Sequence, residues 1–183
     1  MHESSVAISR ERGLTAAGVV GFAVAVGAAS QVALPIPGTA VPMSLAPMAV
    51  VLAGLWLGPR VGAASMMLYL FAGSAGLPVF APVGAPGLLR LVGPTGGYLL
   101  AYPLAAFAAG ALALRHPSLG GRVAAAAVGM AVMHLGGIAQ LSVLTGSVGM
   151  AVLLGSLPFI GMDFVKSILA GVLSRGRRDS ARA

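Results

Sequence analysis

The sequence predicts an all-α integral membrane protein with about six transmembrane helices, organised as a single membrane domain over residues 1–183. Hydrophobic residues make up 58% of the chain and charged residues only 8%, whereas a soluble domain carries about a quarter charged residues. Several stretches run for close to twenty residues without a charge, which is the length a helix needs to cross the hydrocarbon core of a bilayer. Lipid rather than water is therefore expected to surround most of the chain.

The first three helices are predicted at residues 14–34, 43–58 and 61–76. The stretch PIPGTAVP at 35–42 separates the first helix from the second, because its prolines and glycine do not suit a continuous helix. The tripeptide GPR at 58–60 predicts a tight turn into the third helix.

The last three helices are predicted at residues 97–114, 122–144 and 158–174. Pro158 suits the first turn of the sixth helix, because its missing N–H would have no partner there. Between the third and fourth helices, residues 77–97 contain prolines and glycines throughout. An irregular lid loop is expected there instead of a helix.

The basic residues predict the orientation of the chain. If both termini are cytoplasmic, nine of the eleven lysines and arginines lie on the cytoplasmic side, which is the side where such residues concentrate. The sequence thus predicts a multi-pass protein of the cell (inner or plasma) membrane with cytoplasmic tails at both ends. The net charge of +7 fits this distribution better than nucleic-acid binding, since the arginines form no patch interleaved with aromatic residues.

Three charged residues depart from this distribution. Asp163 and Lys166 lie within the sixth helix, and Arg90 lies in the irregular loop on the extracytoplasmic side. An ionised side chain inside a bilayer costs at least a few kcal/mol and usually serves a function. At a spacing of three residues, Asp163 and Lys166 share a helix face, so one interpretation is a structural ion pair. Such a pair leaves Arg90 unexplained and is a poor stabiliser, because desolvation can exceed the Coulomb attraction.

The other interpretation is a substrate pocket that opens to the outside. One negative and two positive charges leave one net positive charge, which a ligand with a single carboxylate would balance. Lys166 or Arg90 would pair with that carboxylate, and an arginine can do so through two parallel N–H bonds. An ionised Asp163 only accepts hydrogen bonds, so it suits a ligand with N–H donors.

Several motifs are specific in combination, namely GLPVF at 76–80, GPTGGY at 93–98, and PF at 158–159 followed by D-x-x-K at 163–166. From about residue 14 to about residue 174, the chain resembles the BioY family, the biotin-specific S components of energy-coupling-factor (ECF) transporters. The resemblance implies an ECF S-component-like fold that binds biotin from outside with high affinity, without catalysis or a cofactor of its own. It also implies a transmembrane coupling subunit and a pair of cytoplasmic ATPases as partners.

The resemblance and the charge argument together give the candidate substrate-binding residues. These are Asp163, Lys166, Arg90, Tyr98, Phe80, Thr95 and Ser44. Ser44 keeps a hydroxyl where the family is expected to carry threonine, whereas Ala46 lacks the amide of an expected glutamine. Tyr98 suits either an interfacial aromatic belt or stacking on a bicyclic ligand. Which end of biotin meets Asp163 is left open.

Small residues recur at four-residue steps along the first helix, and such a stripe lets another helix backbone approach closely. The stripe consists of Ala17, Gly21, Ala25 and Ala29. Packing within the same protein explains the pattern as well as docking does, and the resemblance favours docking of the coupling subunit. Ala23 and Gly27 offer a second stripe of the same kind.

Other functions stay open at this point. An S component for another small carboxylate vitamin fits the same charges, and an intramembrane enzyme such as a serine protease would need a serine beside His134. His134 is expected to be hydrogen-bonded inside the bundle. It has no second histidine or acid at metal-site spacing, and the chain has no cysteine, so no metal site is expected. ATP hydrolysis would belong to partner subunits, because no phosphate-binding glycine loop is present. Homo-oligomer formation is also left open.

Overall fold

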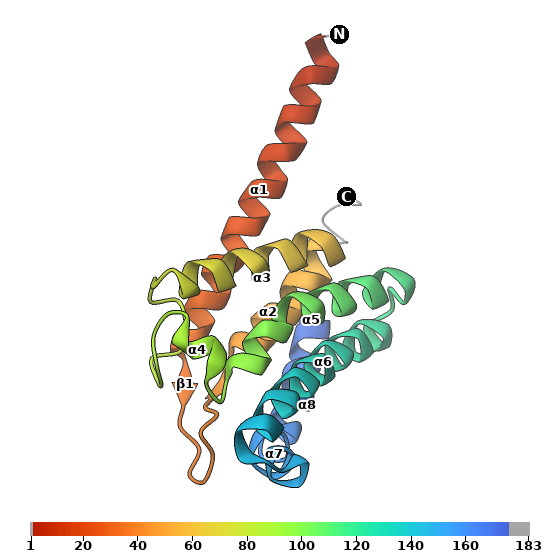
Figure 1. Cartoon of the computed structure of the whole chain (residues 1–183). Coiled ribbons are helices and arrows are strands. Elements are labelled where there is room, and N and C mark those ends of the chain that lie inside the picture. Colours follow the sequence, from red (N-terminus) through yellow and green to blue (C-terminus); the bar gives the residue numbers. More distant parts are fainter. Residues whose placement is uncertain (1, 176–183) are drawn as a thin grey trace.

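The computed structural model describes residues 2–175, and of residues 2–11 it describes the backbone alone. Figure 1 shows a bundle of helices from which one helix projects well beyond the others. The helices are α1 His2–Gln31, α2 Ala46–Leu57, α3 Pro59–Ser74, α4 Leu89–Val92, α5 Gly96–Arg115, α6 Leu119–Thr145, α7 Val148–Gly155 and α8 Ile160–Leu173. Between α1 and α2, the strands β1 (Ala33–Leu34) and β2 (Met43–Ser44) form a short antiparallel pair.

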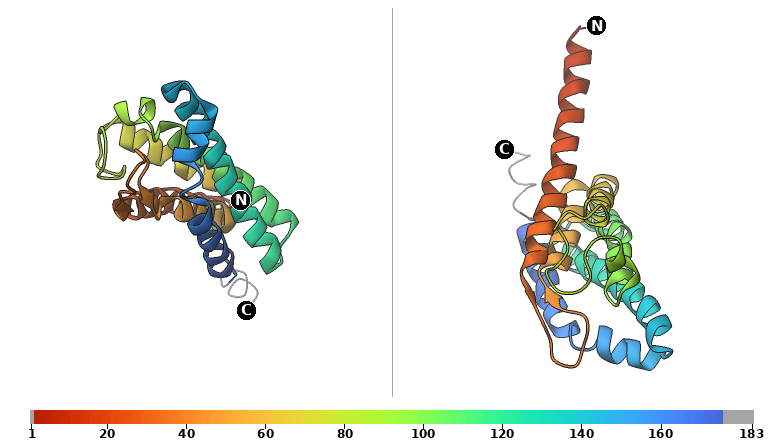
Figure 2. Two further views of the ribbon diagram at one scale, coloured as in Figure 1. Left: turned by 90° about the horizontal axis from the view of Figure 1, so that it is seen from below. Right: turned by 60° about the vertical axis from the view of Figure 1, so that its left-hand side comes forward.

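The projecting helix is α1, which begins at His2, well before the predicted start at residue 14, and ends at Gln31. Its portion Arg12–Gln31 is long and apolar enough to cross a membrane. The right-hand view of Figure 2 shows the N-terminal part of α1 standing clear of the other helices. The polar residues before the predicted span therefore continue the same helix.

Within residues 2–175, three helices are long and apolar enough to cross a membrane by themselves, namely α1 from Arg12, α5 and α6. α7 and α8 add a fourth span if the 55° bend between them lies within one crossing. α2 has 12 residues and is therefore about 18 Å long, short of the roughly 30 Å of a hydrocarbon core. The predicted total of six spans is not confirmed.

The end of the chain differs from the prediction in two details. α8 begins at Ile160 with Phe159 as its N-cap residue, so Pro158 precedes the helix instead of lying in its first turn. α7 occupies Val148–Gly155, a segment for which no helix was predicted. Asp163 lies in the first turn of α8.

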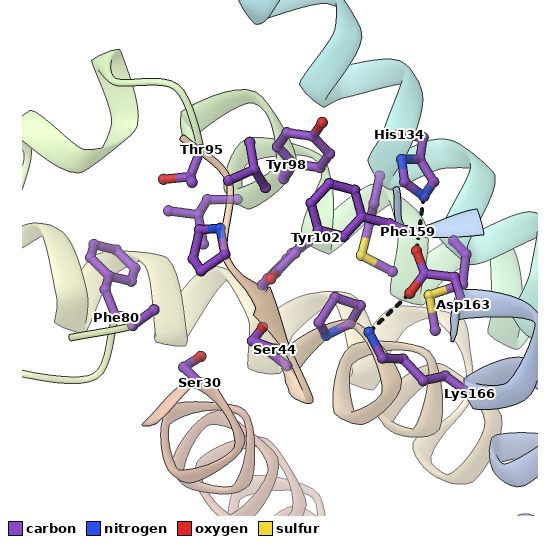
Figure 3. A pocket seen from close by; sticks show the side chains of 18 of the residues that line it. Ser30, Ser44, Phe80, Thr95, Tyr98, Tyr102, His134, Phe159, Asp163 and Lys166 are labelled. Carbon is purple, nitrogen blue, oxygen red and sulfur yellow. Dashed lines mark hydrogen bonds and ion pairs between the residues drawn. The ribbon is translucent and has the colours of Figure 1, made fainter. Parts of the chain in front are cut away.

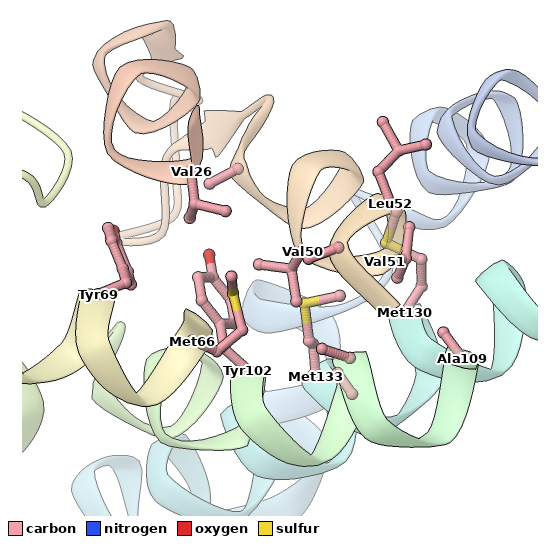
Figure 4. Packing of buried hydrophobic residues seen from close by; sticks show 14 of the residues in the cluster. Val26, Val50, Val51, Leu52, Met66, Tyr69, Tyr102, Ala109, Met130 and Met133 are labelled. Atoms are coloured by element: carbon pink, nitrogen blue, oxygen red, sulfur yellow. The ribbon is translucent and has the colours of Figure 1, made fainter. Parts of the chain in front are cut away.

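Glycines and alanines set the distances between helices at the centre of the bundle. A Cβ atom on Gly54 of α2 would lie 2.1 Å from the Ala106 carbonyl oxygen of α5, and one on Gly97 of α5 would lie 2.1 Å from the Gly136 carbonyl oxygen of α6. Small residues permit such close contact, which holds helices together in lipid. The buried cluster in Figure 4 includes Val50, Val51, Met66, Tyr69, Tyr102, Met130 and Met133. Close contact thus fixes α5 against α6, and both carry residues of the candidate site.

Candidate substrate-binding site

One cavity is lined by residues from α1, the β1–β2 hairpin, α2, α3, the α3–α4 loop, α4, α5, α6 and α8 (Figure 3). Its volume is about 80 Å³, which is room for several waters at roughly 10–15 Å³ each. The structure brings all seven predicted site residues to this cavity. They are Ser44, Phe80, Arg90, Thr95, Tyr98, Asp163 and Lys166. Their part in binding a ligand stays a prediction.

Asp163 is the centre of a buried charged cluster. Lys166 Nζ donates to Asp163 Oδ1 at 2.9 Å, and His134 Nε2 lies 2.9 Å from Asp163 Oδ2. The exposed fractions of the Asp163 and Lys166 side chains are 12% and 4%. The ion pair of the structural interpretation is therefore present, and both of its members also line the cavity. Removing one member of such a pair leaves an uncompensated buried charge, at a cost of about 3–5 kcal/mol.

Arg90 lines the same cavity but directs its donors to the loop that precedes it. Its Nε donates to the Ala85 carbonyl oxygen at 2.8 Å and its Nη2 to that of Ala81 at 2.6 Å, while Nη1 donates to the carbonyl oxygen of Val83. The side chain is buried, and burial lowers the pKa of its guanidinium. Arg90 remains a cation in proteins, so it still contributes the positive charge expected of it while holding the loop.

The segment between α3 and α4 is attached at a second point, in α1. Gln31 Nε2 donates to the Phe80 carbonyl oxygen at 3.1 Å and to the carbonyl oxygen of Gly27 in its own helix at 3.1 Å. The Phe80 ring lies against Gly73 of α3, where a Cβ atom would be 2.2 Å from the ring. Residues 77–88 are irregular as expected, and α4 interrupts the remainder. Gln31 and Arg90 thus hold this segment over the cavity, and a lid movement is not confirmed.

Aromatic side chains form another wall of the cavity. The Tyr69 ring lies 5.4 Å from that of Phe80 in an edge-to-face arrangement and 6.0 Å from that of Tyr102 in a stacked one. Ser30 Oγ donates to the Val26 carbonyl oxygen and lies 2.9 Å from the Tyr69 hydroxyl, which must therefore be the donor to Ser30. Tyr69 both belongs to the core cluster and lines the cavity.

Tyr98 is half-buried and lines the cavity. Its hydroxyl donates to the carbonyl oxygen of Gly155, and its ring meets α6 where a Cβ atom on Gly137 would be 2.0 Å away. The ring also lies 6.1 Å from that of His134, at 81°. Figure 3 shows Tyr98 and Thr95 on the same side of the cavity. Both positions are set by the close contact between α5 and α6.

The sequence argument did not include His134 in the site. His134 lines the cavity and is hydrogen-bonded inside the bundle, as expected, to Asp163 and to Ser156, whose Oγ lies 3.0 Å from His134 Nδ1. The sequence did contain a signal that could have placed His134 in the site. Asp163 and His134 each lie in a predicted helix that is mostly apolar, and ionisable groups inside a membrane tend to pair. Within the described residues, no group of three or more histidine, cysteine or acidic side chains could hold a metal ion.

The serine beside His134 does not make a hydrolase site. Ser156 is buried and is absent from the residues that line the cavity. Asp163, which would orient the histidine of such a site, also holds Lys166. A substrate in the cavity would therefore meet Asp163 and His134 but not the Ser156 hydroxyl.

The two small-residue stripes of α1 face in different directions. Ala17, Gly21 and Ala25 are exposed, and Ala29 is half-buried. Ala23 is buried, and a Cβ atom on Gly27 would lie 3.3 Å from Val79. Packing within the same protein therefore accounts for the second stripe, and it does not account for the exposed part of the first.

The BioY family profile matches residues 4–183 of the chain. The chain belongs to the BioY family. Over 134 residues it is 39% identical to the probable biotin transporter BioY of Pyrococcus horikoshii, covering 73% of this chain and 78% of that protein. Over 139 residues it is 33% identical to the biotin transporter BioY of Thermotoga maritima, covering 76% of this chain and 82% of that protein.

A solved structure agrees with this assignment. The crystal structure at 2.1 Å of the S component for biotin from an ECF-type ABC transporter has a TM-score of 0.85 to this chain at 25% identity, over 93% of each chain. The predicted family and the predicted helical S-component fold are confirmed. BioY proteins are components of transporters and not enzymes, as the resemblance implied.

Proposed function

We propose that the chain captures biotin outside the cell as the substrate-binding subunit of an ECF transporter. One observation carries the proposal: the buried charges Asp163 and Lys166 line one cavity together with Arg90 and a wall of aromatic side chains. A transmembrane coupling subunit and a pair of cytoplasmic ATPases complete the transporter. Biotin is the only small molecule required by the chain itself, which works without a cofactor.

The chemistry of biotin complements the cavity. Biotin has one carboxylate, which balances the single excess positive charge left by Arg90 and Lys166 against Asp163. Its ureido ring has two N–H donors and a carbonyl, and an ionised carboxylate such as that of Asp163 accepts from N–H donors. The apolar parts of biotin suit Phe80 and Tyr69, since binding sites combine apolar walls with a few placed polar groups.

Basic residues support an orientation in the cell membrane with the cavity toward the outside. A second cavity, lined by Gly58, Leu114, Arg122 and Ser174 among others, brings together the ends of α2, α5, α6 and α8. Three exposed arginines lie at or within three residues of the ends of α2, α5 and α8, namely Arg60, Arg115 and Arg175. Basic residues mark the cytoplasmic side, so both termini are assigned to the cytoplasm. The arginines beyond residue 175 lie outside the described residues.

Equilibrium binding of radiolabelled biotin to the purified protein tests the proposal. We expect tight binding at one biotin per chain in the absence of ATP, and recovery of chemically unchanged biotin. Competition with unlabelled lipoate and other carboxylate vitamins tests the alternative of a different vitamin. Biotin that fails to bind, or that is displaced more effectively by another vitamin, would overturn the assignment.

The exposed stripe of α1 supports docking of the coupling subunit. We expect Ala25→Trp to impair biotin uptake in cells that express the whole transporter, and to leave biotin binding by the purified subunit unchanged, because the bulk lies outside the bundle. Val24→Trp is the matched control, since Val24 is also exposed but lies outside the small-residue stripe. Equal loss of uptake in both variants, or loss of binding in Ala25→Trp, would contradict docking through this stripe.

A further inference from the structure

A chain of hydrogen bonds connects the end of α7 to the charged cluster through α6. Ser156 Oγ lies 3.0 Å from His134 Nδ1, His134 Nε2 lies 2.9 Å from Asp163 Oδ2, and Lys166 Nζ lies 2.9 Å from Asp163 Oδ1. Figure 3 shows His134 and Lys166 approaching the Asp163 carboxylate from opposite sides. Of these residues, Ser156 alone does not line the cavity.

The proton positions in this chain follow from what each group can donate. Asp163, ionised beside Lys166, can only accept. His134 Nε2 must therefore carry a proton and donate it to Asp163 Oδ2. In the neutral imidazole Nδ1 is then an acceptor, and the Ser156 hydroxyl is the donor to it. Asp163 thereby selects the tautomer of His134, as the partner of one ring nitrogen generally does for the other, and Ser156 holds the orientation of the ring.

The consequence concerns the two oxygens of Asp163. A carboxylate has about four acceptor sites, and Lys166 and His134 occupy one on each oxygen. One site on each oxygen remains for a ligand. The rotation of an aspartate carboxylate about its last torsion is otherwise broad and roughly two-fold, and donors on both oxygens remove that freedom. The cavity thus presents a fixed pair of acceptor sites.

The ring of His134 is itself held between aromatic neighbours. The Tyr98 ring lies 6.1 Å away at 81°, and the Phe159 ring lies 6.5 Å away at 39°. The hydrogen bonds to Ser156 and Asp163 fix the directions in which its two ring nitrogens point. Because the His134 ring is held by these four neighbours, it can in turn hold the Asp163 carboxylate in one orientation. Supporting residues pre-organise a binding group in this way.

We propose that His134 is a positioning residue for ligand capture: Ser156 fixes the orientation of its ring, and His134 fixes the Asp163 carboxylate so that it accepts from an N–H donor of the ligand. This inference rests on the proposed function, because it takes a ureido N–H of biotin as that donor. It assigns to Asp163 the ring end of biotin, and leaves the carboxylate end to the cationic residues.

Four variants test the proposal by biotin titration of the purified protein. His134→Leu removes the donor and is expected to weaken binding by roughly 10- to 100-fold, the effect of losing a hydrogen bond to a charged group. His134→Gln keeps an N–H donor and is expected to restore most of that loss. Ser156→Ala is expected to weaken binding several-fold, about what one neutral hydrogen bond contributes, and Ser156→Thr, which keeps the hydroxyl, to restore it.

A second readout separates positioning from simple packing. Methylation of one ureido nitrogen of biotin removes one N–H donor and is expected to weaken binding to the wild-type protein. For the nitrogen that faces Asp163, that penalty should be smaller in His134→Leu, where the carboxylate is no longer fixed to accept from it. Wild-type affinity in His134→Leu, or an unchanged methylation penalty, would overturn the positioning role and leave biotin capture intact.

The tautomer can be measured without ligand, so this part does not depend on biotin binding. Nitrogen-15 NMR of protein labelled at its histidines should show the Nε2–H tautomer for His134, assigned through its absence in His134→Leu. Ser156→Ala should leave this tautomer in place, because Asp163 still accepts from Nε2. A protonated imidazole, or the Nδ1–H tautomer in the wild-type protein, would overturn the hydrogen-bond order. Failure of the wild-type protein to bind biotin would instead overturn the proposed function.

Discussion

Lys166→Ala is expected to weaken biotin binding by at least ten-fold, which is about 1.4 kcal/mol or more. The substitution removes a cation from the cavity and leaves Asp163, 12% exposed, without its charged partner. Asp163→Asn is expected to lose at least as much, because the amide replaces one acceptor oxygen by a donor nitrogen. Titration of both purified variants with labelled biotin measures the effect.

A double variant provides the control for folding. Asp163→Asn combined with Lys166→Met removes both charges, and replacement of a buried ion pair by uncharged groups is often neutral for stability. The double variant should therefore insert and purify with a melting temperature closer to wild type than that of Lys166→Ala, while binding stays weak. If both single variants bind biotin as the wild-type protein does, the cavity is not the binding site.

Arg90→Lys is expected to weaken biotin binding by at least ten-fold although the positive charge is kept. Arg90 reaches three carbonyl oxygens, those of Ala81, Val83 and Ala85, with three different nitrogens. Lysine has one nitrogen on a flexible stem and cannot reproduce that fork. The loop over the cavity would then keep its hydrogen bond to Gln31 but lose the three-point contact with Arg90, and biotin should dissociate faster.

Gly84→Ala tests the same contact without changing any charge. Gly84 has a φ of +102° that suits glycine, and a Cβ atom there would lie 2.9 Å from Arg90 Nη1. Limited proteolysis should cut the loop faster in both variants, and biotin dissociation should accelerate in both. A variant in which proteolysis accelerates but biotin binding is unchanged would show that the loop does not retain the ligand.

The sequence was sufficient to predict the class of the protein and the centre of its candidate site. Charged residues are so rare in the apolar segments that Asp163 and Lys166 can be recognised as candidate site residues. Their spacing alone predicts the shared helix face. Arg90 was assigned to the cavity correctly, but its three carbonyl partners could not be predicted. These partners depend on the path of an irregular loop, which no periodic pattern describes.

Residues whose position depends on tertiary contacts were missed for a related reason. Tyr69 and His134 resemble ordinary core residues in the sequence, and the cavity that they line exists only once α3 and α6 meet α5. The number of spans stays a prediction, because apolar composition marks burial in protein and burial in lipid alike. α2 illustrates this, since an apolar helix of 12 residues is too short to span.

The short length of α2 bears on how the protein senses its bilayer. Every residue from Val50 to Leu55 is buried by neighbouring helices, so α2 has little hydrophobic length of its own to match to the lipid. Helices that do span respond to hydrophobic mismatch by tilting or by deforming the bilayer. A change in acyl-chain thickness therefore alters the tilt of helices that span, such as α5 and α6. These two helices carry Tyr98 and His134, so their tilt changes the shape of the ligand cavity.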